Sequence, residues 1–456
     1  MSERKTIYLC LAHMSETGEE QKYVKEAFDT NWVVPMGPNV NAFEQDLANF
    51  VNHNTDGTTL DRKVVCLSAG TAAVHLALLA CGVGPGDEVC VQSFTFCASS
   101  HPITYLGATP VFIGSEPDTW NMDPALLEKA ILDRKEKTGK YPKAIVPVAL
   151  YGMPYKIDEI MAIANKYGIP VVEDAAEGMG SRYKGQVLGT FGKFGVLSFN
   201  GNKMITTSGG GALICQNPED AQTIMWYATQ ARDAYPYYEH TAIGYNYRMS
   251  NVCAGIGRGQ MTVLDDHIAH HKHVQALYEE LFADVPGVHI HKQPITLDPL
   301  THEPVFDANY WLCAATIDPD VHVQGQEDAY KEVIKTAVGG AAGVIKAVES
   351  ATTDCQPNEN VEALRVFMLN KKVECRPVWK PMHCQPVYRN GAQVVGHGSL
   401  LTGHEYDIIE GPNMVAYTSH ICEDLFKVGF CLPAGPYVTD DDVRYIVDCI
   451  ISAIDK

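Results

Sequence analysis

The chain has 456 residues, of which 46% are hydrophobic and 20% are charged, so we expect a globular protein of about two or three domains. Its 55 acidic and 35 basic side chains give a formal net charge of -20, which argues against non-specific binding to nucleic acid or to an anionic membrane. The first residues lack the apolar run of a signal peptide, and no later stretch approaches the roughly 18 apolar residues of a membrane-spanning helix. We therefore expect a soluble, cytoplasmic protein.

The 14 cysteines occur singly along the chain, from Cys10 to Cys449, and no two of them form a C-x-x-C pair. Such scattered cysteines indicate reduced and mostly buried thiols rather than a disulfide framework.

From Val64 to about Gln216, short β-branched runs alternate with amphipathic stretches, a pattern typical of a mostly parallel sheet covered by helices. This predicts an α/β domain of about seven strands. The predicted strands are Val64–Leu67, Glu88–Gln92, Pro110–Ile113, Ala144–Leu150, Pro170–Glu173, Val196–Phe199 and Gly211–Cys215. The predicted helices are Ala72–Cys81, Pro124–Arg134 and Ile157–Tyr167.

The regular alternation stops after a long predicted helix from Asn251 to about Phe282. We therefore expect a large domain over residues 1–270 and a smaller C-terminal α/β domain over 271–456. Thr439 and Asp442 predict a capping box at the start of the last helix. Residues 319–359, which are rich in glycine, alanine and polar residues, predict an insertion containing a helix and a mobile loop.

Lys203 lies in the run SFNGNKMITTSGGG, which begins at Ser198 and ends at Gly211. Small and apolar residues surround this lysine, whereas a surface lysine usually has charged neighbours. Such a lysine can carry an aldehyde cofactor, and the alternative is an ordinary loop lysine.

The turn Ser68-Ala-Gly-Thr71 follows a predicted strand and opens a predicted helix. Backbone N–H groups at a helix N-terminus bind anions, although many strand-to-helix turns are merely capped in this way. Asp174 ends another predicted strand, at the edge where open α/β sheets bind ligands. It either pairs with a cationic group or caps the next helix.

Together, a lysine, a carboxylate and an anion-binding turn are the parts that a pyridoxal phosphate enzyme needs. The lysine forms the Schiff base, the acid keeps the pyridine nitrogen protonated, and the turn holds the phosphate. Phe96, which follows a further strand, is a candidate to stack on the flat ring, and the neighbouring Phe94 fits the protein core equally well.

With these residues assembled, the sequence resembles the nucleotide-sugar aminotransferases of the DegT/DnrJ/EryC1/StrS family, which have the type I (aspartate aminotransferase) fold. The resemblance extends from the N-terminal segment Asn31–Gly37 to the C-terminal motifs. It rests on the ordered motifs SAGTAAVHLAL, GPGDEVCVQSFTF, EDAAEGMGS, SFNGNKMITTSGGG, GYNYRMSN, ECRPVWKPMH and CLPAG. Within the family it looks most like the C4 aminotransferases of UDP-N-acetylbacillosamine synthesis.

The resemblance implies a role for each matching residue. Lys203 would bind the cofactor and shuttle a proton, Asp174 would pair with the pyridine nitrogen, and Phe96 would stack on the ring. The remaining cofactor contacts would be Gly70, Thr71 and Ser198 at the phosphate, Glu177 near the ring oxygen, and Asn246 reaching the phosphate from the partner subunit of a homodimer. Glu177 departs from the glutamine that many relatives have.

The implied reaction is ping-pong. Glutamate gives its amino group to the cofactor, and a UDP-linked 4-keto sugar (UDP-2-acetamido-4-keto-2,4,6-trideoxyglucose) then takes that group at C4. The alternative substrate is another nucleotide keto sugar, of the GDP-perosamine type or a dTDP-linked 3- or 4-keto sugar. The matching sugar contacts are Pro35, Met36, Trp379, Lys380 and His383. Trp379 fits hinge packing between domains as an alternative, and the role of Arg248 stays open.

The sequence also bears on two alternative functions and on a metal site. A sugar dehydratase branch of the family has histidine at the lysine position, so Lys203 argues against it, and an inactive regulatory protein need not keep lysine, aspartate and phosphate turn together. The run Asp265-Asp-His-Ile-Ala-His-His-Lys-His273 places His267 one helical turn from His270 and His271. Because it lacks H-E-x-x-H and a clear third ligand, we interpret it as a solvated helix face and expect no metal.

Overall fold

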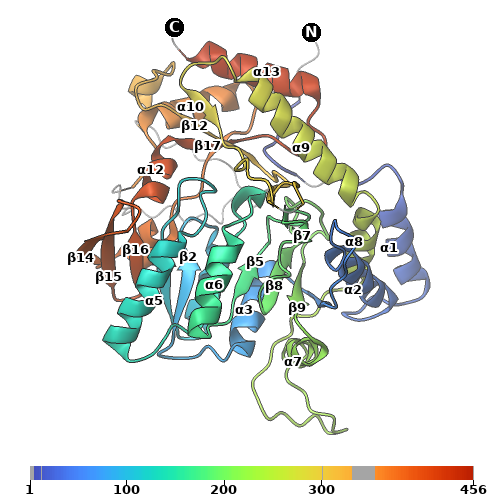
Figure 1. Ribbon diagram of the computed structural model, residues 1–456. Helices are drawn as coiled ribbons and strands as arrows, with labels where there is room; N and C mark the ends of the chain where they lie inside the picture. Colours follow the sequence, from blue (N-terminus) through green and yellow to red (C-terminus); the bar gives the residue numbers. More distant parts are fainter. Residues whose placement is uncertain (1–4, 12, 300, 331–354, 455–456) are drawn as a thin grey trace.

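A central β-sheet organises the larger part of the molecule in the computed structural model, which describes residues 5–454 apart from 12, 300 and 331–354 (Figure 1). Two bridges, Ile145 to Val171 and Val148 to Asp174, join a six-stranded and a four-stranded part into one surface. The strand order across it is β14 (Gln393–Ser399), β15 (Glu405–Gly411), β16 (Met414–Thr418), β3 (Thr109–Ile113), β2 (Glu88–Gln92), β4 (Ala144–Val146), β5 (Val172–Asp174), β8 (Phe194–Ser198), β9 (Gly211–Cys215) and β1 (Lys63–Leu67). All seven predicted strands are therefore confirmed.

Three strands of this sheet come from the C-terminal third of the chain. β16 pairs in parallel with β3, and β14 and β15 follow it as an antiparallel extension at the edge of the sheet. The sequence pattern did not predict this extension. The extension places residues 393–418 beside strands from the N-terminal half of the chain. The division of the chain into domains at residue 270 stays a prediction.

Alternating side chains along the strands pack on opposite faces of the sheet. In β2, Val89 and Val91 belong to one hydrophobic core, whereas Cys90 belongs to the other. One face is covered by α2 (Pro38–Val51), α5 (Pro124–Thr138) and α6 (Ile157–Tyr167), and the other by α3 (Gly70–Ala80), α4 (His101–Tyr105), α7 (Pro218–Ala228) and α11 (Pro386–Arg389). The sheet is thus buried on both faces, which explains its continuous apolar strands.

The C-terminal part has its own small sheet and its own core. Its antiparallel strands run in the order β10 (Val288–Ile290), β12 (Cys313–Ile317), β17 (Gly429–Leu432) and β13 (Arg376–Pro377). The helices nearby are α9 (Leu264–Leu281), α10 (Glu359–Asn370), α12 (Ile421–Val428) and α13 (Asp440–Ala453). Apolar residues of α9, α10 and α13 pack with the strands in one cluster, at the top of Figure 1.

Glycines let three helices pack closely beside the main sheet. α8 (Asn251–Met261) lies against α1 (Glu19–Asp29) and α2. A Cβ added at Gly257 would lie 2.5 Å from the Phe43 ring, and one at Gly259 would lie 2.5 Å from the Glu20 backbone nitrogen. Glycine at these positions therefore allows the close contact. A small third sheet joins β11 (Phe306–Asp307), β6 (Arg182–Tyr183) and β7 (Gln186–Val187).

The remaining predictions of secondary structure had mixed outcomes. The capping box of Thr439 and Asp442 is confirmed. The long helical stretch over 251–282 is confirmed, although it consists of two helices, α8 and α9, with a break at Thr262 and Val263. Most of the predicted insertion, residues 331–354, lies outside the described residues.

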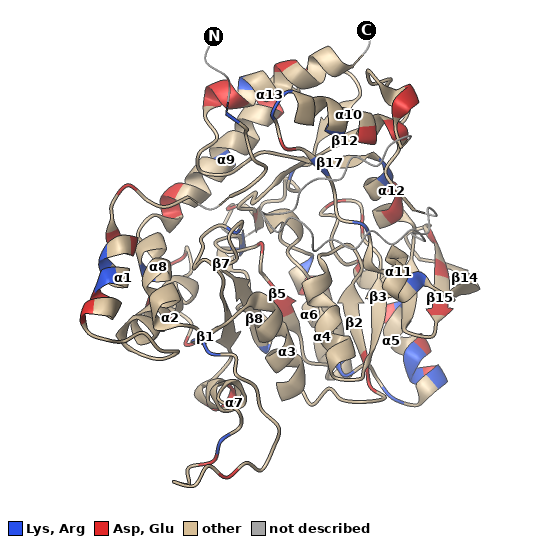
Figure 2. Ribbon diagram, turned by 180° about the vertical axis from the view of Figure 1, so that it is seen from behind, with Lys and Arg blue, Asp and Glu red and all other residues tan. Residues whose placement is uncertain are grey.

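Acidic positions are spread over the outer helices, including α12 and α13, as Figure 2 shows. Within the described residues, no helix is both long and apolar enough to span a membrane.

Candidate active site

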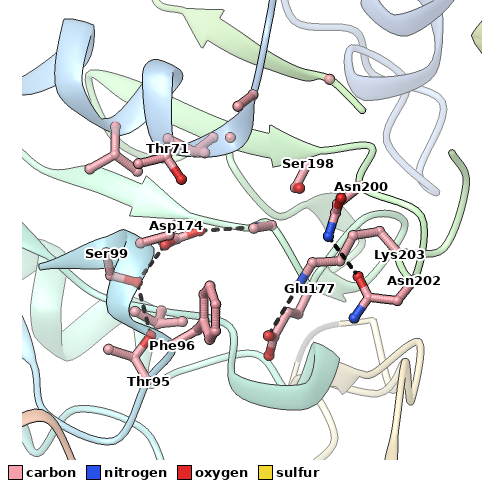
Figure 3. A pocket seen from close by; sticks show the side chains of 18 of the residues that line it. Thr71, Thr95, Phe96, Ser99, Asp174, Glu177, Ser198, Asn200, Asn202 and Lys203 are labelled. Atoms are coloured by element: carbon pink, nitrogen blue, oxygen red, sulfur yellow. Dashed lines mark hydrogen bonds and ion pairs between the residues drawn. The ribbon is translucent and has the colours of Figure 1, made fainter. Parts of the chain in front are cut away.

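A cavity of about 440 Å³ opens where β5 and β8 end and α3 begins (Figure 3). In a parallel sheet this edge carries the carboxyl ends of the strands and the N-termini of the following helices, so polar groups converge there. Eight of the residues predicted from the sequence line it, namely Gly70, Thr71, Phe96, Asp174, Glu177, Ser198, Lys203 and Trp379.

Lys203 reaches the cavity from the turn that follows β8. Its backbone N–H donates to Asn200, which closes a tight turn, and Trp311 fixes this turn by donating from Nε1 to the Asn202 carbonyl at 2.7 Å. The Lys203 Nζ lies 3.2 Å from Glu177 Oε1 and 4.0 Å from the centre of a Trp311 ring. The side chain is only 12% exposed, so the ammonium group is held by one carboxylate and one aromatic face.

Glu177 connects the lysine to a second element. Its Oε2 accepts the backbone N–H of Tyr151 at 2.8 Å, while its Oε1 faces Lys203. Burial raises the pKa of the Glu177 carboxyl, and the adjacent Lys203 opposes this rise. The pair is therefore a buried, directional contact that aims Nζ into the cavity.

Asp174 is buried at the end of β5 with few partners. Its Oδ2 accepts from the Ser99 hydroxyl at 2.6 Å, and its Oδ1 accepts the Ala176 N–H at 3.1 Å. Burial raises the pKa of this carboxyl, and Ser99 is the strongest group that opposes the rise. Within the described part of the chain, no cation forms an ion pair with Asp174. A protonated ring nitrogen would provide the missing positive charge.

The N-terminus of α3 supplies an anion-binding site opposite Asp174. The residue at its N-cap, Ala69, has no side-chain oxygen to accept hydrogen bonds from the first backbone N–H groups of the helix. These N–H groups can therefore donate to a bound anion. Gly70 approaches Ser198 so closely that an added Cβ would lie 3.1 Å from the Ser198 Cβ. The helix end, Thr71 and the Ser198 hydroxyl thus form a cradle that fits a phosphate.

Aromatic side chains line one side of the cavity. The Phe96 and Trp379 rings lie 5.3 Å apart, and the Trp379 backbone N–H donates to the Tyr151 hydroxyl at 2.7 Å. Phe94, the other candidate, is fully buried and belongs to the core. Tyr151 therefore touches both Glu177, through its N–H, and Trp379, through its hydroxyl.

Five predicted contacts do not line this cavity, namely Pro35, Met36, Asn246, Lys380 and His383. His383 is 1% exposed, and its imidazole contacts Ser93 on one nitrogen and Glu423 on the other. Its ring is therefore engaged inside the protein, and we no longer assign it a contact with the sugar. Met36 is 45% exposed on the surface of the single chain.

Three residues of the site were missed by the sequence analysis. Ser99 lies three residues after Phe96, which was itself predicted to face the cofactor. Its short distance from Phe96 in the sequence could therefore have indicated that its hydroxyl also reaches the site, where it contacts Asp174. Tyr151 has a left-handed backbone with φ of 54°, and Trp311 comes from a distant segment. Neither position stands out in the sequence, because each depends on how separate segments meet.

His267 and His271 do not lie on a solvated face of α9, which corrects that interpretation, whereas His273 is exposed. His267 and His271 are buried, and their Nδ1 atoms contact the carbonyls of Met204 and Tyr310 at 3.1 Å. Burial lowers the pKa of His271 to about 3, so its ring is neutral. Both rings serve as packed core histidines.

Comparison with known proteins agrees with this geometry. A model of the DegT/DnrJ/EryC1/StrS aminotransferase family matches residues 14–338. The chain belongs to this family. It is 37% identical to EpsN of Bacillus subtilis (strain 168), named as a pyridoxal phosphate-dependent aminotransferase, over 98% of this chain and 95% of EpsN. It is 32% identical to a GDP-perosamine synthase of Escherichia coli O157:H7, over 97% of this chain and 98% of that protein.

Solved structures show the same fold. An aminotransferase of the family from Brucella abortus has a TM-score of 0.73 at 22% identity and covers 96% of both chains. The aminotransferase TlmJ from Streptoalloteichus hindustanus has a TM-score of 0.73 at 23% identity and covers 98% of both chains.

The protein is therefore a pyridoxal phosphate-dependent sugar aminotransferase with the type I fold. The residues present fit this cofactor, because the cavity offers a lysine, a phosphate cradle and a buried carboxylate that lacks a cationic partner.

Proposed function

We propose that the protein transfers the amino group of glutamate to C4 of a UDP-linked 4-keto-6-deoxy-N-acetylhexosamine, the sugar that leads to bacillosamine-type glycans. The observation that carries the proposal is the single cavity that joins Lys203 and Asp174 to the aromatic pair Phe96 and Trp379. The first pair suits amine chemistry on a cofactor, and the second pair offers flat faces to a sugar or base.

Pyridoxal phosphate, when bound, supplies a carbonyl that condenses with amines and a ring that accepts electrons from the substrate carbon. The α3 N-terminus, Thr71 and Ser198 would hold its phosphate, and Asp174 would face its ring nitrogen. Ser99 fixes the orientation of the Asp174 carboxylate through the hydrogen bond of 2.6 Å. Phe96 would lie against the ring.

Lys203 moves the proton in both halves of the reaction. Its Nζ would carry the proton of the glutamate α carbon to C4′ of the cofactor, and in the second half would carry a proton from C4′ to C4 of the sugar. Glu177 and the Trp311 ring hold Nζ at one place and cover it from water. The face from which Nζ delivers the proton would then decide the configuration of the new amine.

The wall formed by Trp379 would receive the nucleotide sugar. Tyr151 fixes the Trp379 backbone through the hydrogen bond of 2.7 Å, so the same residue positions the lysine side and the sugar side. Lys380, the next residue, would supply a cation for the diphosphate.

A GDP-linked 4-keto-6-deoxy sugar is a second candidate substrate. Relatives from Escherichia coli, Caulobacter vibrioides and Vibrio cholerae are all named as GDP-perosamine synthases, and the first of them matches nearly the whole chain. A Pseudomonas aeruginosa relative named as a UDP-2-acetamido-2-deoxy-3-oxo-D-glucuronate aminotransferase covers 54% of the chain and supports a UDP sugar.

We further propose that the active form is a homodimer in which each chain completes the other's site. Two exposed apolar segments suit such an interface. The first comprises Trp32, Val33, Val34 and Met36, and the second is the arm that projects beyond α7 and carries Tyr235, Tyr237, Tyr238 and Ile243 (Figure 1). Asn246 follows this arm and does not line its own chain's cavity, so it would reach the phosphate of the partner's cofactor. Pro35 and Met36 would contact sugar from the same interface.

The test is to incubate the purified protein with glutamate and a panel of UDP-, GDP- and dTDP-linked keto sugars, and to identify products by mass and NMR. We expect 2-oxoglutarate and a 4-amino sugar from the UDP-linked 4-keto substrate. Turnover of the GDP-linked 4-keto sugar alone would favour the second candidate. Turnover of a dTDP-linked 3-keto sugar alone would contradict both.

A further inference from the structure

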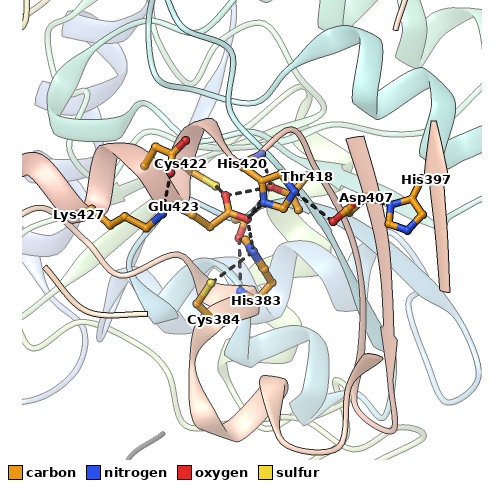
Figure 4. Close-up of polar contacts among 11 residues, drawn as sticks. His383, Cys384, His397, Asp407, Thr418, His420, Cys422, Glu423 and Lys427 are labelled. Atoms are coloured by element: carbon orange, nitrogen blue, oxygen red, sulfur yellow. Dashed lines mark hydrogen bonds and ion pairs between the residues drawn. The ribbon is translucent and has the colours of Figure 1, made fainter. Parts of the chain in front are cut away.

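A second cluster of reactive side chains lies outside the active-site cavity, where the segment after Trp379 meets α12. His383, in the short turn Met382–Cys384, faces Cys422 and Glu423 at the start of α12 (Figure 4). The His383 Nε2 lies 2.9 Å from Glu423 Oε1, and the Cys422 Sγ lies 3.0 Å from Glu423 Oε2. The three donor atoms all lie within 4.8 Å of one another.

The cluster offers nitrogen, sulfur and oxygen donors, which is the ligand set of zinc in proteins. With metal–ligand distances of about 2.0–2.3 Å, the ligands of a tetrahedral zinc ion lie roughly 3.3–3.8 Å apart. Cys384 offers a fourth donor, because its Sγ lies 3.4 Å from His383 Nε2. Three donors therefore already lie together, and a movement of the Cys384 side chain would bring a fourth donor to the same ion.

Neighbouring groups already orient the ligands. Ser93 Oγ contacts His383 Nδ1 at 2.6 Å, which turns Nε2 toward the cluster. The Thr418 hydroxyl lies 2.9 Å from both oxygens of Glu423. Metal-binding histidines and carboxylates are usually held in this way by a second layer of hydrogen bonds.

Burial and access also suit a bound ion. The His383 side chain is 2% exposed and Cys422 is fully buried, so the donors are shielded from bulk water. A cavity of about 220 Å³ adjoins the cluster and is lined by His383, Cys384 and Glu423. This cavity gives an ion a route to the buried donors.

We propose that His383, Cys384, Cys422 and Glu423 bind a structural zinc ion. The two thiols lose their protons to solvent when the ion binds, and no oxidation or reduction is involved. The ion would tie the turn that follows Trp379 to α12, which packs against β12 and β17 of the small sheet. This proposal replaces the expectation of a protein without metal, and it does not depend on which sugar is the substrate.

The test uses the untagged protein with its cofactor, loaded with zinc and dialysed. Elemental analysis should find about one zinc ion per chain, and X-ray absorption at the zinc edge should show sulfur at about 2.3 Å together with nitrogen or oxygen at about 2.0 Å. Removing zinc with a chelator should lower the midpoint of thermal unfolding by several degrees. Less than roughly a tenth of an ion per chain, or a shell without sulfur, would overturn the proposal.

Variants separate a metal site from a hydrogen-bond network of the same residues. C422S keeps a hydroxyl beside Glu423 but removes a sulfur donor, and it should bind zinc at least about tenfold more weakly. C384S, at a partly exposed position, provides the same test if C422S does not fold. C449S changes another buried cysteine, on α13, and should bind zinc like the parent protein. Unchanged zinc binding in both C422S and C384S would contradict the proposal.

Discussion

The proposed cofactor side and the proposed sugar side of the cavity are built in different ways. On the cofactor side, Asp174, Ser198 and the N-terminus of α3 come from strand ends and a helix start of one continuous sheet. On the sugar side, Trp379 comes from the C-terminal part and is fixed by one hydrogen bond to Tyr151. Changes on the cofactor side should therefore impair both halves of the reaction, whereas changes on the sugar side should impair one.

The largest effect is expected for K203A. Removing the group to which we assign cofactor binding and proton transfer should lower the rates of both half-reactions by at least about 10³-fold. Stopped-flow absorbance with glutamate, and separately with the keto sugar, measures the two halves. K193A, which removes a lysine paired with Asp220 on the surface, should keep both rates. A K203A protein with one half-reaction intact would contradict the expectation that changes on the cofactor side impair both half-reactions.

D174N should be the next most severe change. The amide keeps the shape of the carboxylate but cannot balance a protonated ring nitrogen, so both half-reactions should slow by about 10²-fold or more. The same absorbance measurements apply, with D220N as the control for a partly buried aspartate elsewhere. Loss of the sugar half-reaction alone would show that Asp174 does not act through the cofactor.

Y151F should affect mainly the sugar side. It leaves the N–H bond to Glu177 in place and removes the hydroxyl that accepts from the Trp379 backbone. Leaving that N–H without a partner costs about 1–3 kcal/mol, so KM for the sugar should rise about tenfold while the glutamate half-reaction changes little. Y278F removes a comparable buried hydrogen bond to Pro433 and should leave both half-reactions unchanged. Equal losses in both halves would argue against a sugar-side role for Tyr151.

E177Q should have the smallest effect at neutral pH, about fivefold or less, because its amide oxygen keeps one of the two acceptor contacts, to Lys203 or to the Tyr151 N–H. The pH profile should change more. Burial raises the pKa of Glu177, so acidification protonates this carboxyl above its usual range and removes the ion pair to Lys203. The parent enzyme should thus lose activity on the acidic side, and E177Q should lose less. Identical acidic limbs in rate-against-pH measurements would mean that Glu177 does not titrate in this range.

The same contrast explains what the sequence could predict. Strands such as Glu88–Gln92 were predicted because burial on both faces requires continuous apolar runs. Asp174 followed from its place at the end of such a strand and Lys203 from its small and apolar neighbours, whereas Ser198 was assigned only by the family resemblance. These residues were predicted correctly as neighbours because parallel strands end at one edge of the sheet.

The contacts between separate segments could not be predicted in this way. Trp379 was predicted from its motif, but Tyr151, which holds its backbone, and Trp311, which lies against Lys203, reach the site through long-range contacts for which local patterns carry no signal. His383 stands next to residues of the same motif as Trp379, yet the Met382–Cys384 turn directs its ring toward Ser93 and Glu423. Similarly, β14–β16 join the large sheet although they lie far away in the chain, which periodicity alone cannot reveal.

Chemical trapping of the cofactor tests the central claim most directly. The protein is incubated with pyridoxal phosphate, reduced with borohydride and digested, and the modified peptide is identified by mass spectrometry. We predict a phosphopyridoxyl group on Lys203 and its loss when glutamate is added before reduction, because the cofactor then carries the amino group. Modification of a different lysine, or no stable modification, would contradict the account.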